Sequence, residues 1–371
     1  MINICCLVIF TTLAALTVRP EIGRLYKSGF QGFNILIWIA AIWMSCLIGL
    51  RVEYNDTAAY ISNFNSKGTI LEMLKDSEAL SWGKNPLFEL YTTFIHSLTH
   101  NYHIYFMISA VFVVISFLKF FMQECEIDVL PYSIFLFFTF GTYFFSLAAM
   151  KQTIAMAILT YAIVALQKKQ HLRFIIIVLL ATLFHTYSIL FLMLLLLNTK
   201  PWRTRTILII LATVAIMFTF KGTLTSILQY ADSLGKDVAE EGLFNGAAMN
   251  TLRVAVYGIT PVMLYLGNEY LEPKMCEKHY ILIHMSILSF MFILLGSING
   301  ANLFGRMARY FEVGTIVMLP WAIKNMFNEK SEKLINLMMV ILFFMFFMYD
   351  YQDFGVAYRS ITIFEFLKGI I

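Results

Sequence analysis

The stretch "FNILIWIAAIWMSCLIGL" at residues 33–50 runs directly into "RVEYNDTAAY" at residues 51–60. The first stretch contains no charged side chain, whereas the second places Arg51, Glu53 and Asp56 close together. A helix of about 20 apolar residues is what crosses the roughly 30 Å hydrocarbon core of a bilayer. The stretch therefore predicts a membrane span that ends in a polar rim.

The rest of the chain is equally apolar. Of its 371 residues, 60% are hydrophobic and 13% are charged, with a mean hydropathy of +0.75, whereas about a quarter of the residues in soluble domains are charged. The apolar residues are spread over the whole length, so we expect residues 1–371 to form a single integral membrane domain. No basic residue precedes the first run and no cleavage pattern follows it, which favours a retained span over a signal peptide.

Apolar runs of helical length divide the chain into an all-α polytopic membrane protein. We expect about ten transmembrane helices, near residues 2–18, 32–50, 103–122, 131–149, 151–167, 206–220, 251–268, 279–298, 308–325 and 333–349. Two further segments are ambiguous: residues 86–100 are short and amphipathic, and residues 174–197 are long and interrupted by "FHTYS". We expect an external segment with amphipathic helices at residues 51–100 and an external loop at residues 221–250.

Lys and Arg collect in loops that face the cytoplasm, and this rule sets the orientation. It places both chain ends and the hinge at Met150 and Lys151 outside. The basic loops that we assign to the cytoplasm are residues 19–27, 167–173, 324–333 and, more weakly, 274–279.

The basic loop at residues 198–205 conflicts with this orientation if residues 174–197 cross the membrane once. We therefore expect residues 174–197 to form a re-entrant or broken helix pair that turns near His185. Each arm has about twelve residues, which is too short to cross alone. Non-helical backbone at membrane depth requires surrounding protein or a water-filled cavity, so we expect His185 in a cavity open to the outside.

The charge pattern argues against nucleic-acid binding, and the cysteine pattern argues against a metal or redox site. The net charge of +4 is distributed among short loops, so it describes topology and not nucleic-acid binding. The five cysteines show no metal or redox spacing. No carboxylate or cysteine cluster accompanies His96, His100 and His103, so we expect neither a metal nor a cofactor.

Several polar side chains interrupt the apolar runs, and in the predicted orientation all of them lie toward the external leaflet. A charge at the bilayer centre costs at least about 2.5 kcal/mol, so charges that persist there usually face a cavity. External Arg and Lys also break the cytoplasmic preference of these residues. The residues concerned are Arg51, Glu53, Asp56, Lys151, Gln152, His185, Arg306 and Arg309.

Most of these residues have both a structural and a chemical interpretation. Arg51 is either an interfacial snorkelling side chain or an anion clamp, and Asp56 is either a helix N-cap or a general base. His185 is either a hydrogen-bonded bundle histidine or a base. Lys151 is either a topology marker or, with Gln152, a buried pair that needs polar partners.

Arg306 and Arg309 are three positions apart, so one helix face presents both guanidiniums. Two guanidinium forks on one face match a phosphate or a pyrophosphate well. The alternative is that they only anchor the helix at the interface.

Four segments in this order resemble the EpsG/Wzy-like family of bacterial surface-polysaccharide polymerases. They are "RVEYNDTAAYISNF" (51–64), "AMKQTIAMAILTYAIVALQKKQ" (149–170), "FIIIVLLATLFHTYSILFL" (174–192) and "GRMARYFEVGTIVMLP" (305–320). The similarity extends from about residue 35 to residue 320. Two positions depart from the family pattern: Lys151 stands where the family usually has Arg, and Asn55 stands where it commonly has Gly.

The resemblance implies a GT-C-like polymerase architecture in the bacterial plasma (inner) membrane, with the active site facing the periplasm or exterior. It implies an enzyme that joins polyprenyl-pyrophosphate-linked oligosaccharide repeat units into O-antigen, capsule or exopolysaccharide. The partners it implies are a lipid-linked donor and a lipid-linked acceptor, membrane lipid, and a chain-length regulator and a flippase as further candidates, without nucleic acid.

The resemblance also implies roles for the polar residues around one external pocket. Arg306 and Arg309, with Arg51 or Lys151, bind the pyrophosphate, and Gln152 bonds sugar or phosphate. Asp56, ranked above His185, deprotonates or orients the acceptor hydroxyl. The remaining candidates line the substrate site, with the aromatic ones stacking on sugars: Glu53, Tyr60, Trp82 and Tyr310.

Two other classes of function remain open from the sequence. A membrane-bound O-acyltransferase would use His185 as a base toward a sugar hydroxyl, but it has no use for paired external arginines. A lipid-linked oligosaccharide flippase predicts internal repeats and charges at both leaflets, and the sequence shows neither.

Overall fold

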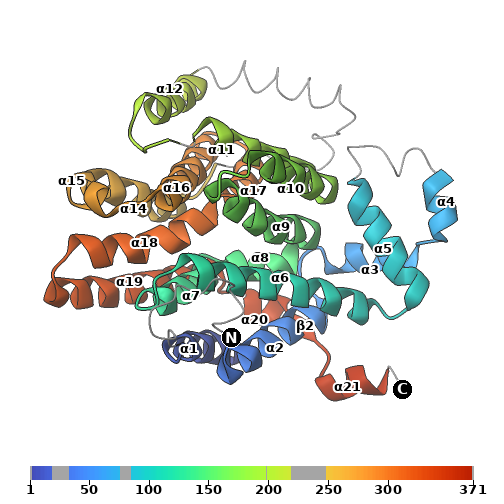
Figure 1. The fold of residues 1–371 in the computed structure, drawn as a ribbon. Helices are drawn as coiled ribbons and strands as arrows, with labels where there is room; N and C mark the ends of the chain where they lie inside the picture. Colours follow the sequence, from blue (N-terminus) through green and yellow to red (C-terminus); the bar gives the residue numbers. More distant parts are fainter. Residues whose placement is uncertain (1, 19–32, 76–84, 198, 219–247, 370–371) are drawn as a thin grey trace. The chain divides into compact units, whose positions relative to one another are not determined.

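The chain folds almost entirely into α-helices (Figure 1). The computed structural model describes residues 2–18, 33–75, 85–197, 199–218 and 248–369. Within these ranges, the prediction of an all-α, membrane-type fold is confirmed. By length and composition, five helical segments there are long and apolar enough to cross a membrane: Tyr102–Glu124 (α6), Leu130–Ala148 (α7 and α8), Met150–Gln167 (α9), Glu277–Gly296 (α16) and Glu329–Asp350 (α19).

The shorter helices of the described residues include six of 14–16 residues, and five of these coincide with predicted spans. They are α1 (Ile2–Leu16), α2 (Ile35–Gly49), α10 (His171–Phe184), α12 (Thr204–Phe218), α14 (Thr251–Leu266) and α18 (Glu312–Met326). At 1.5 Å per residue, such helices are roughly 21–24 Å long. The exception is α10, which is the first arm of the predicted broken pair.

Short elements connect these helices. They are β1 (Arg51–Glu53), α3 (Thr57–Asn65), α4 (Ile70–Lys75), α5 (Pro86–Leu98), η3 (Thr186–Leu192), α11 (Met193–Leu196), α15 (Asn268–Leu271), η4 (Glu272–Lys274), α17 (Ala301–Arg309), α20 (Phe354–Ala357), β2 (Arg359–Ser360) and α21 (Ile363–Lys368). Helices α3, α4 and α5 occupy the predicted external segment 51–100. Residues 76–84, which include Trp82, and residues 221–247 of the predicted external loop lie outside the described residues.

The chain divides into two compact units. Unit 1 consists of Met1–Ala162, Ile176–Thr186 and Lys333–Ile371. Unit 2 consists of Ile163–Ile175 and Tyr187–Glu332.

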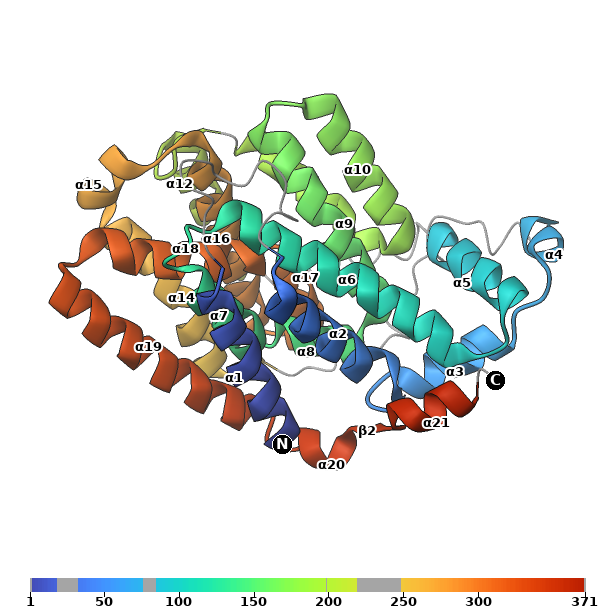
Figure 2. The same ribbon diagram turned by 60° about the horizontal axis from the view of Figure 1, so that its bottom comes forward.

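In unit 1, α2 packs along α6, and α1 packs against α2 and α7 (Figure 2). The interior is rich in aromatic rings; the Phe137 ring, for example, lies 5.1 Å from that of Phe117 and 5.2 Å from that of Phe121. Hydrocarbon offers no hydrogen-bond partner, so polar groups must be satisfied within the protein. The buried hydroxyl of Tyr143 accordingly donates to the carbonyl oxygen of Met44 at 2.9 Å.

The span predicted at residues 131–149 is broken at Gly141, between α7 (Leu130–Thr139) and α8 (Thr142–Ala148). Gly141 has a φ of +83°, and a Cβ at this position would lie 2.2 Å from the hydroxyl oxygen of Tyr351. The same hydroxyl donates to the Gly141 carbonyl oxygen at 3.3 Å. Because this partner comes from a distant part of the sequence, the hydropathy of the span does not reveal the break.

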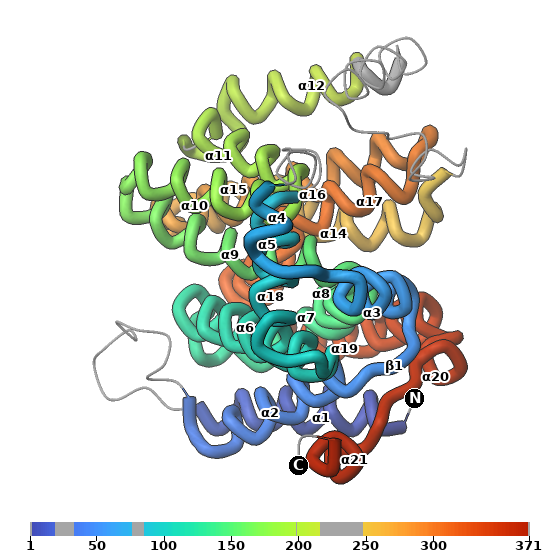
Figure 3. The backbone as a smooth tube through the Cα atoms, turned by 90° about the vertical axis from the view of Figure 1, so that its right-hand side faces the viewer, coloured from blue at the N-terminus to red at the C-terminus, as the bar shows by residue number. Residues whose placement is uncertain are grey.

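The C-terminal segment of unit 1 closes over the end of α2. Strands β1 and β2 pair antiparallel, with Arg51 opposite Ser360. Figure 3 shows the red segment between α20 and α21 passing beside β1. The Tyr358 hydroxyl donates to the Leu47 carbonyl oxygen at 2.6 Å, and the Ile361 N–H donates to the Leu50 carbonyl oxygen at 3.0 Å. These bonds satisfy carbonyl groups that the end of a helix leaves unpaired.

In unit 2, α14, α17 and α18 all pack against α16 (Figure 1). Gly314 allows α18 to approach α16 closely, because a Cβ there would lie 2.4 Å from the Leu282 carbonyl oxygen and 2.6 Å from the Met285 Cβ. Small residues at such crossings are typical of membrane helices.

One end of unit 2 gathers basic loops that the sequence places on the cytoplasmic side. Lys169 pairs with Glu277 at 2.8 Å, and Lys200 pairs with Glu272 at 3.1 Å. The Lys274 ammonium donates to the Asn325 carbonyl oxygen at 2.6 Å. We call this end, defined by these six residues, the basic face.

Lys169 and Lys200 both lie at the basic face. The chain therefore leaves this end of unit 2 after residue 169 and returns to it by residue 200. Helix α10 ends at Phe184, and the chain continues after His185 as η3. The ring of Phe174 near the start of α10 stacks on that of Phe191 in η3, with centroids 6.3 Å apart. Residues 174 and 191, on the two sides of the break, are therefore neighbours within unit 2, and the break falls at His185, as predicted.

This hairpin predicts that cysteines introduced at Lys169 and Arg203 lie on the same side of the membrane. With the five native cysteines replaced, a membrane-impermeant maleimide should modify neither site in intact cells and both after permeabilisation. A cysteine at Ser360 is the control and should be modified in intact cells. Modification of one of the first two sites without the other would contradict the hairpin.

Candidate active site

Arg51 is fully buried at the end of α2 in unit 1. Its Nη1 donates to the Ile48 carbonyl oxygen at 2.6 Å, and its Nε donates to the Thr57 Oγ1 at 3.2 Å. Its Cζ lies 4.1 Å from the centroid of the Phe106 ring, in cation–π geometry. These contacts hold the turn between α2 and α3 in one conformation.

Burial lowers the pKa of Arg51 to about 10, so the guanidinium remains protonated at neutral pH. Within the described residues, no carboxylate forms an ion pair with it. The carbonyl at the helix end and the aromatic ring offset the charge less completely than a carboxylate would.

The segment that follows Arg51 presents Asp56 at the surface. Asp56 is exposed, stands at the N-cap of α3, and makes no side-chain capping bond. Asn55 just before it has a φ of +41°, a left-handed conformation that Gly and Asn tolerate better than other residues. The Asp56 carboxylate is therefore exposed and not engaged in capping α3.

Tyr60 and the start of α9 meet in unit 1. The backbone N–H of Lys151 lies 3.5 Å from the Tyr60 hydroxyl oxygen, and Met150 Sδ lies 3.8 Å from an Arg51 nitrogen. Lys151 is half-buried and Gln152 is fully buried. The structure therefore brings Arg51, Tyr60, Lys151 and Gln152, which the sequence analysis selected separately, into one region of unit 1.

His185 also lies in unit 1, at the break in the hairpin, where it is buried. The next residue, Thr186, donates from both its N–H and its hydroxyl to the Asn85 Oδ1, at 3.0 and 3.1 Å. Asn85 precedes α5, and Phe88 in α5 meets the Tyr60 ring edge to face at 6.0 Å. His185 is thereby tied to the predicted external segment.

Glu53 belongs to the surface of unit 1. It pairs with Arg359 at 3.3 Å across the β1–β2 sheet, and both side chains are more than half exposed. Such a pair contributes at most about 1 kcal/mol. Its geometry links Glu53 to the C-terminal segment.

Unit 2 contains the second group of candidates. Arg309 is buried, and its Nη1 donates to both carboxylate oxygens of Glu312, at 2.8 and 3.0 Å. The buried Tyr257 hydroxyl donates to the same carboxylate. Arg306 is half-buried, and its Nε donates to the Asn302 Oδ1 at 3.2 Å. The two arginines thus have different environments, although they are three positions apart.

Tyr310 is buried beside this group, at 3% exposure. Its ring is covered by protein, so its position indicates packing in unit 2.

The sequence analysis missed Glu312 and Tyr257. The available signal was a carboxylate inside an apolar segment, three residues after Arg309, which is the position of a helical ion pair.

Arg51 and His185 belong to unit 1, whereas Arg306 and Arg309 belong to unit 2. Their convergence in one pocket stays a prediction.

The histidines near α5 do not converge. His96 Nε2 and His100 Nδ1 lie 3.2 Å apart, whereas His103 Nδ1 faces the Gly49 carbonyl oxygen at 3.1 Å. Among the residues that the structure describes, no three His, Cys, Asp or Glu side chains are grouped so that they could hold a metal ion.

Comparison with known proteins assigns the family. Residues 34–365, nearly the whole chain, match the EpsG family. The chain belongs to the EpsG family. No curated protein and no solved structure matches it.

The family is associated with glycosyltransferase-like polymerases of polysaccharide biosynthesis, which are membrane proteins. The apolar helices of this EpsG-family chain agree with that association. The left-handed φ of Asn55 also explains how Asn replaces the Gly that the family resemblance leads us to expect there.

The left-handed conformation predicts the effect of substitutions at Asn55. Asn55→Gly should be neutral or slightly stabilising, whereas Asn55→Val should destabilise unit 1 by about 1–2 kcal/mol. Thermal unfolding of the purified protein in detergent measures both. Ala58→Val, on the exposed side of α3, is the control and should cost at most about 0.7 kcal/mol. Equal stability of Asn55→Val and Ala58→Val would contradict the assignment.

The buried ion pair predicts a strong dependence of stability on Glu312. Glu312→Ala leaves the Arg309 charge uncompensated, which should lower the free energy of unfolding by about 3–5 kcal/mol. Adding Arg309→Met to that variant should restore part of the loss. A double-mutant cycle measured by thermal unfolding tests this.

The exposed pair between Lys169 and Glu277 supplies the control for that cycle. Both side chains are 65% exposed, so Glu277→Ala should change stability by less than about 1 kcal/mol. If Glu312→Ala were no more destabilising than Glu277→Ala, the buried pair would not have the importance that we assign to it.

Proposed function

We propose that this chain is a polysaccharide polymerase, a membrane glycosyltransferase that joins polyprenyl-pyrophosphate-linked oligosaccharide units at the outer face of the bacterial plasma membrane. Membership of the EpsG family supports the reaction class. The observation that carries the proposal is the position of Arg306 and Arg309 at the end of α18 remote from the basic face.

The length of α18 supports this placement. Arg309 precedes α18, and Asn325 near its other end bonds Lys274 of the basic face. Fifteen helical residues span roughly 22 Å, which is most of the hydrocarbon core. If the basic face is cytoplasmic, as the distribution of Lys and Arg indicates, then Arg309 lies toward the external leaflet.

Helix α9 gives the same result for Lys151. Lys151 is the second residue of α9, and the helix ends at Gln167, next to the basic loop of residues 167–173. Its eighteen residues span roughly 27 Å. External cations at two places are unusual for a membrane protein, and an anionic substrate on that side would account for them.

In the proposed reaction, a hydroxyl oxygen of the acceptor unit attacks the anomeric carbon of the donor chain. The bond from that carbon to the pyrophosphate oxygen breaks, and the hydroxyl proton passes to a protein base. Negative charge develops on the leaving pyrophosphate, and guanidinium groups stabilise it. Because Glu312 balances the charge of Arg309, we assign the contact with the leaving pyrophosphate to Arg306, three positions before it.

Unit 1 supplies the candidates for the base. The exposed Asp56 carboxylate makes no capping bond, which leaves it available to an incoming hydroxyl. His185 at the hairpin break is the alternative. Lys151 and Gln152 add polar contacts to sugar or phosphate, and Arg51 holds the turn that carries Asp56.

The remaining details belong to the same proposal. About ten spans and the hairpin form a GT-C-like architecture, and the product is O-antigen, capsule or exopolysaccharide. Both lipid-linked substrates enter sideways from the external leaflet, and a chain-length regulator and a flippase act with the enzyme.

Arg306→Ala should abolish long-chain surface polysaccharide and leave lipid carrying a single repeat unit, because the leaving pyrophosphate loses its cation. We expect chain extension to fall by at least about a hundredfold. Arg306→Lys should retain part of the activity, since the charge remains but the fork is lost. Glycan ladders on gels, with mass spectrometry of the lipid-linked intermediates, measure the effect.

Lys330→Ala, at an exposed position at the start of α19, is the matched control and should extend chains normally. Normal chain lengths in Arg306→Ala, at equal protein abundance, would exclude the role of Arg306. If the purified protein in liposomes moved lipid-linked units across the bilayer without lengthening them, or added one acyl group without extension, the polymerase proposal would be wrong.

A further inference from the structure

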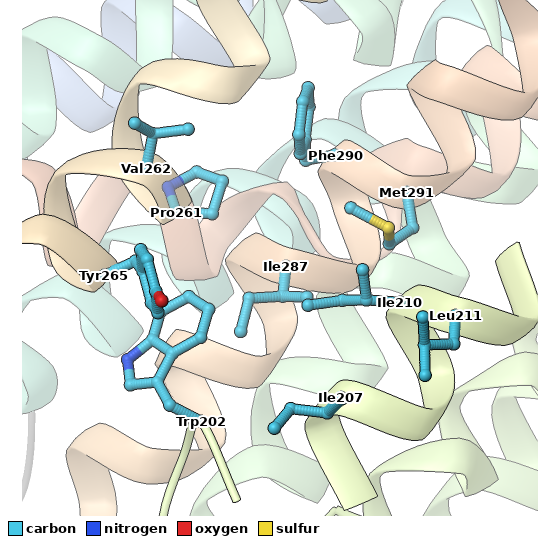
Figure 4. Close-up of a pocket in the computed structure, with 10 residues that line it drawn as sticks. All are labelled: Trp202, Ile207, Ile210, Leu211, Pro261, Val262, Tyr265, Ile287, Phe290 and Met291. Carbon is cyan, nitrogen blue, oxygen red and sulfur yellow. The ribbon is translucent and has the colours of Figure 1, made fainter. Parts of the chain in front are cut away.

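Unit 2 contains an apolar pocket that the proposed reaction does not use (Figure 4). The pocket lies between α12, α14 and α16 and has a volume of about 460 Å³. This is within the range of roughly 300–1,000 Å³ typical of ligand sites. Ile210, Ile287 and Phe290 are among the residues that form its apolar walls.

The pocket begins next to the basic face and extends toward the middle of unit 2. Trp202 lies in the basic loop 198–205, and Tyr265 lies at the end of α14. Ile287 is ten residues into α16, which corresponds to roughly 15 Å from the start of that helix. The pocket therefore has the depth of about half of a 30 Å hydrocarbon core.

The Trp202 indole places a buried polar group at the pocket. Its Nε1 atom is buried, and no acceptor among the described residues reaches it. The ring meets that of Tyr265 edge to face, with centroids 5.2 Å apart, and Figure 4 shows the two rings together at one end of the pocket. A buried N–H without an acceptor costs about 1–3 kcal/mol, so a ligand that supplies an acceptor is favoured there.

The surroundings of Trp202 are positively charged. Residues 199–205 and 267–274 together contain four cations and two carboxylates, a net charge of +2. Lys200 and Arg203 share one carboxylate, that of Glu272, at 3.1 and 3.8 Å. An anionic group at this end would balance the excess charge.

We propose that this pocket binds one acyl chain of an anionic glycerophospholipid from the leaflet at the basic face. The chain fills the apolar walls, an ester carbonyl oxygen accepts from the Trp202 N–H, and the phosphate lies against Arg203. A glycerophospholipid carries these three groups in this order. The tail of a polyprenyl pyrophosphate lacks the ester carbonyl, and its head group is needed at the opposite leaflet in the proposed reaction.

The test is binding of phosphatidylglycerol to the purified, delipidated protein. Titration should raise the thermal unfolding temperature, and native mass spectrometry should detect one tightly retained phospholipid. Trp202→Phe keeps the ring but removes the N–H, so we expect roughly fivefold weaker binding. Ile210→Trp fills the pocket and should abolish the shift in unfolding temperature.

Leu208→Trp is the matched control, because Leu208 lies on α12, is 58% exposed and does not line the pocket. This variant should bind as the wild type does. Absence of retained phospholipid in the wild type, or a wild-type response in both Trp202→Phe and Ile210→Trp, would overturn the proposal. Displacement of phosphatidylglycerol by equimolar polyprenyl phosphate would replace the assigned ligand with an isoprenoid chain. None of these readouts depends on polymerisation.

Discussion

Arg51 is a buried cation held by a carbonyl oxygen, a hydroxyl and an aromatic ring, and this interaction organises one end of unit 1. The carbonyl is that of Ile48 in the last turn of α2, where the helix dipole favours a positive charge. Thr57, whose hydroxyl accepts from Arg51, is the first residue of α3. The Arg51 side chain therefore fixes where α2 ends and where α3 begins. The position of Asp56, between these two contacts, follows from them.

Unit 2 also buries an arginine, but there the guanidinium is stabilised by a carboxylate. Glu312 compensates the charge of Arg309, and the Tyr257 hydroxyl also donates to that carboxylate, so three buried polar side chains bond one another. A buried pair of this kind is strongly coupled, because removal of either member leaves an isolated charge in apolar surroundings. Arg306, three positions before Arg309, is half-buried and donates to the Oδ1 of the neutral Asn302.

The sequence predicted what depends on local hydropathy and missed what depends on distant contacts. The apolar segments were predictable, because each helix that crosses a membrane needs a long apolar run. The break at His185 was predictable, because the basic loops constrain which ends of the helices lie on the same side of the membrane. The interruption at Gly141 depends on Tyr351, and the pairing of β1 with β2 joins the two ends of unit 1. Periodicity within a segment carries no information on either. The three-residue spacing of Arg309 and Glu312 in the sequence is compatible with an ion pair. Whether each arginine faces a ligand or a carboxylate, however, depends on the packing around α17 and α18.

The contrast between the two arginines restricts how a pyrophosphate can be bound. A phosphate oxygen that approached Arg309 would compete with a carboxylate already held through two contacts by a single nitrogen. Displacing Glu312 from Arg309 would separate a buried carboxylate from its cation, and the apolar surroundings make that state unfavourable. Binding through Arg306, with Arg309 kept in its ion pair, avoids this penalty. The pair of Arg309 and Glu312 then positions the end of α17, and Arg306 on the same helix contacts the ligand.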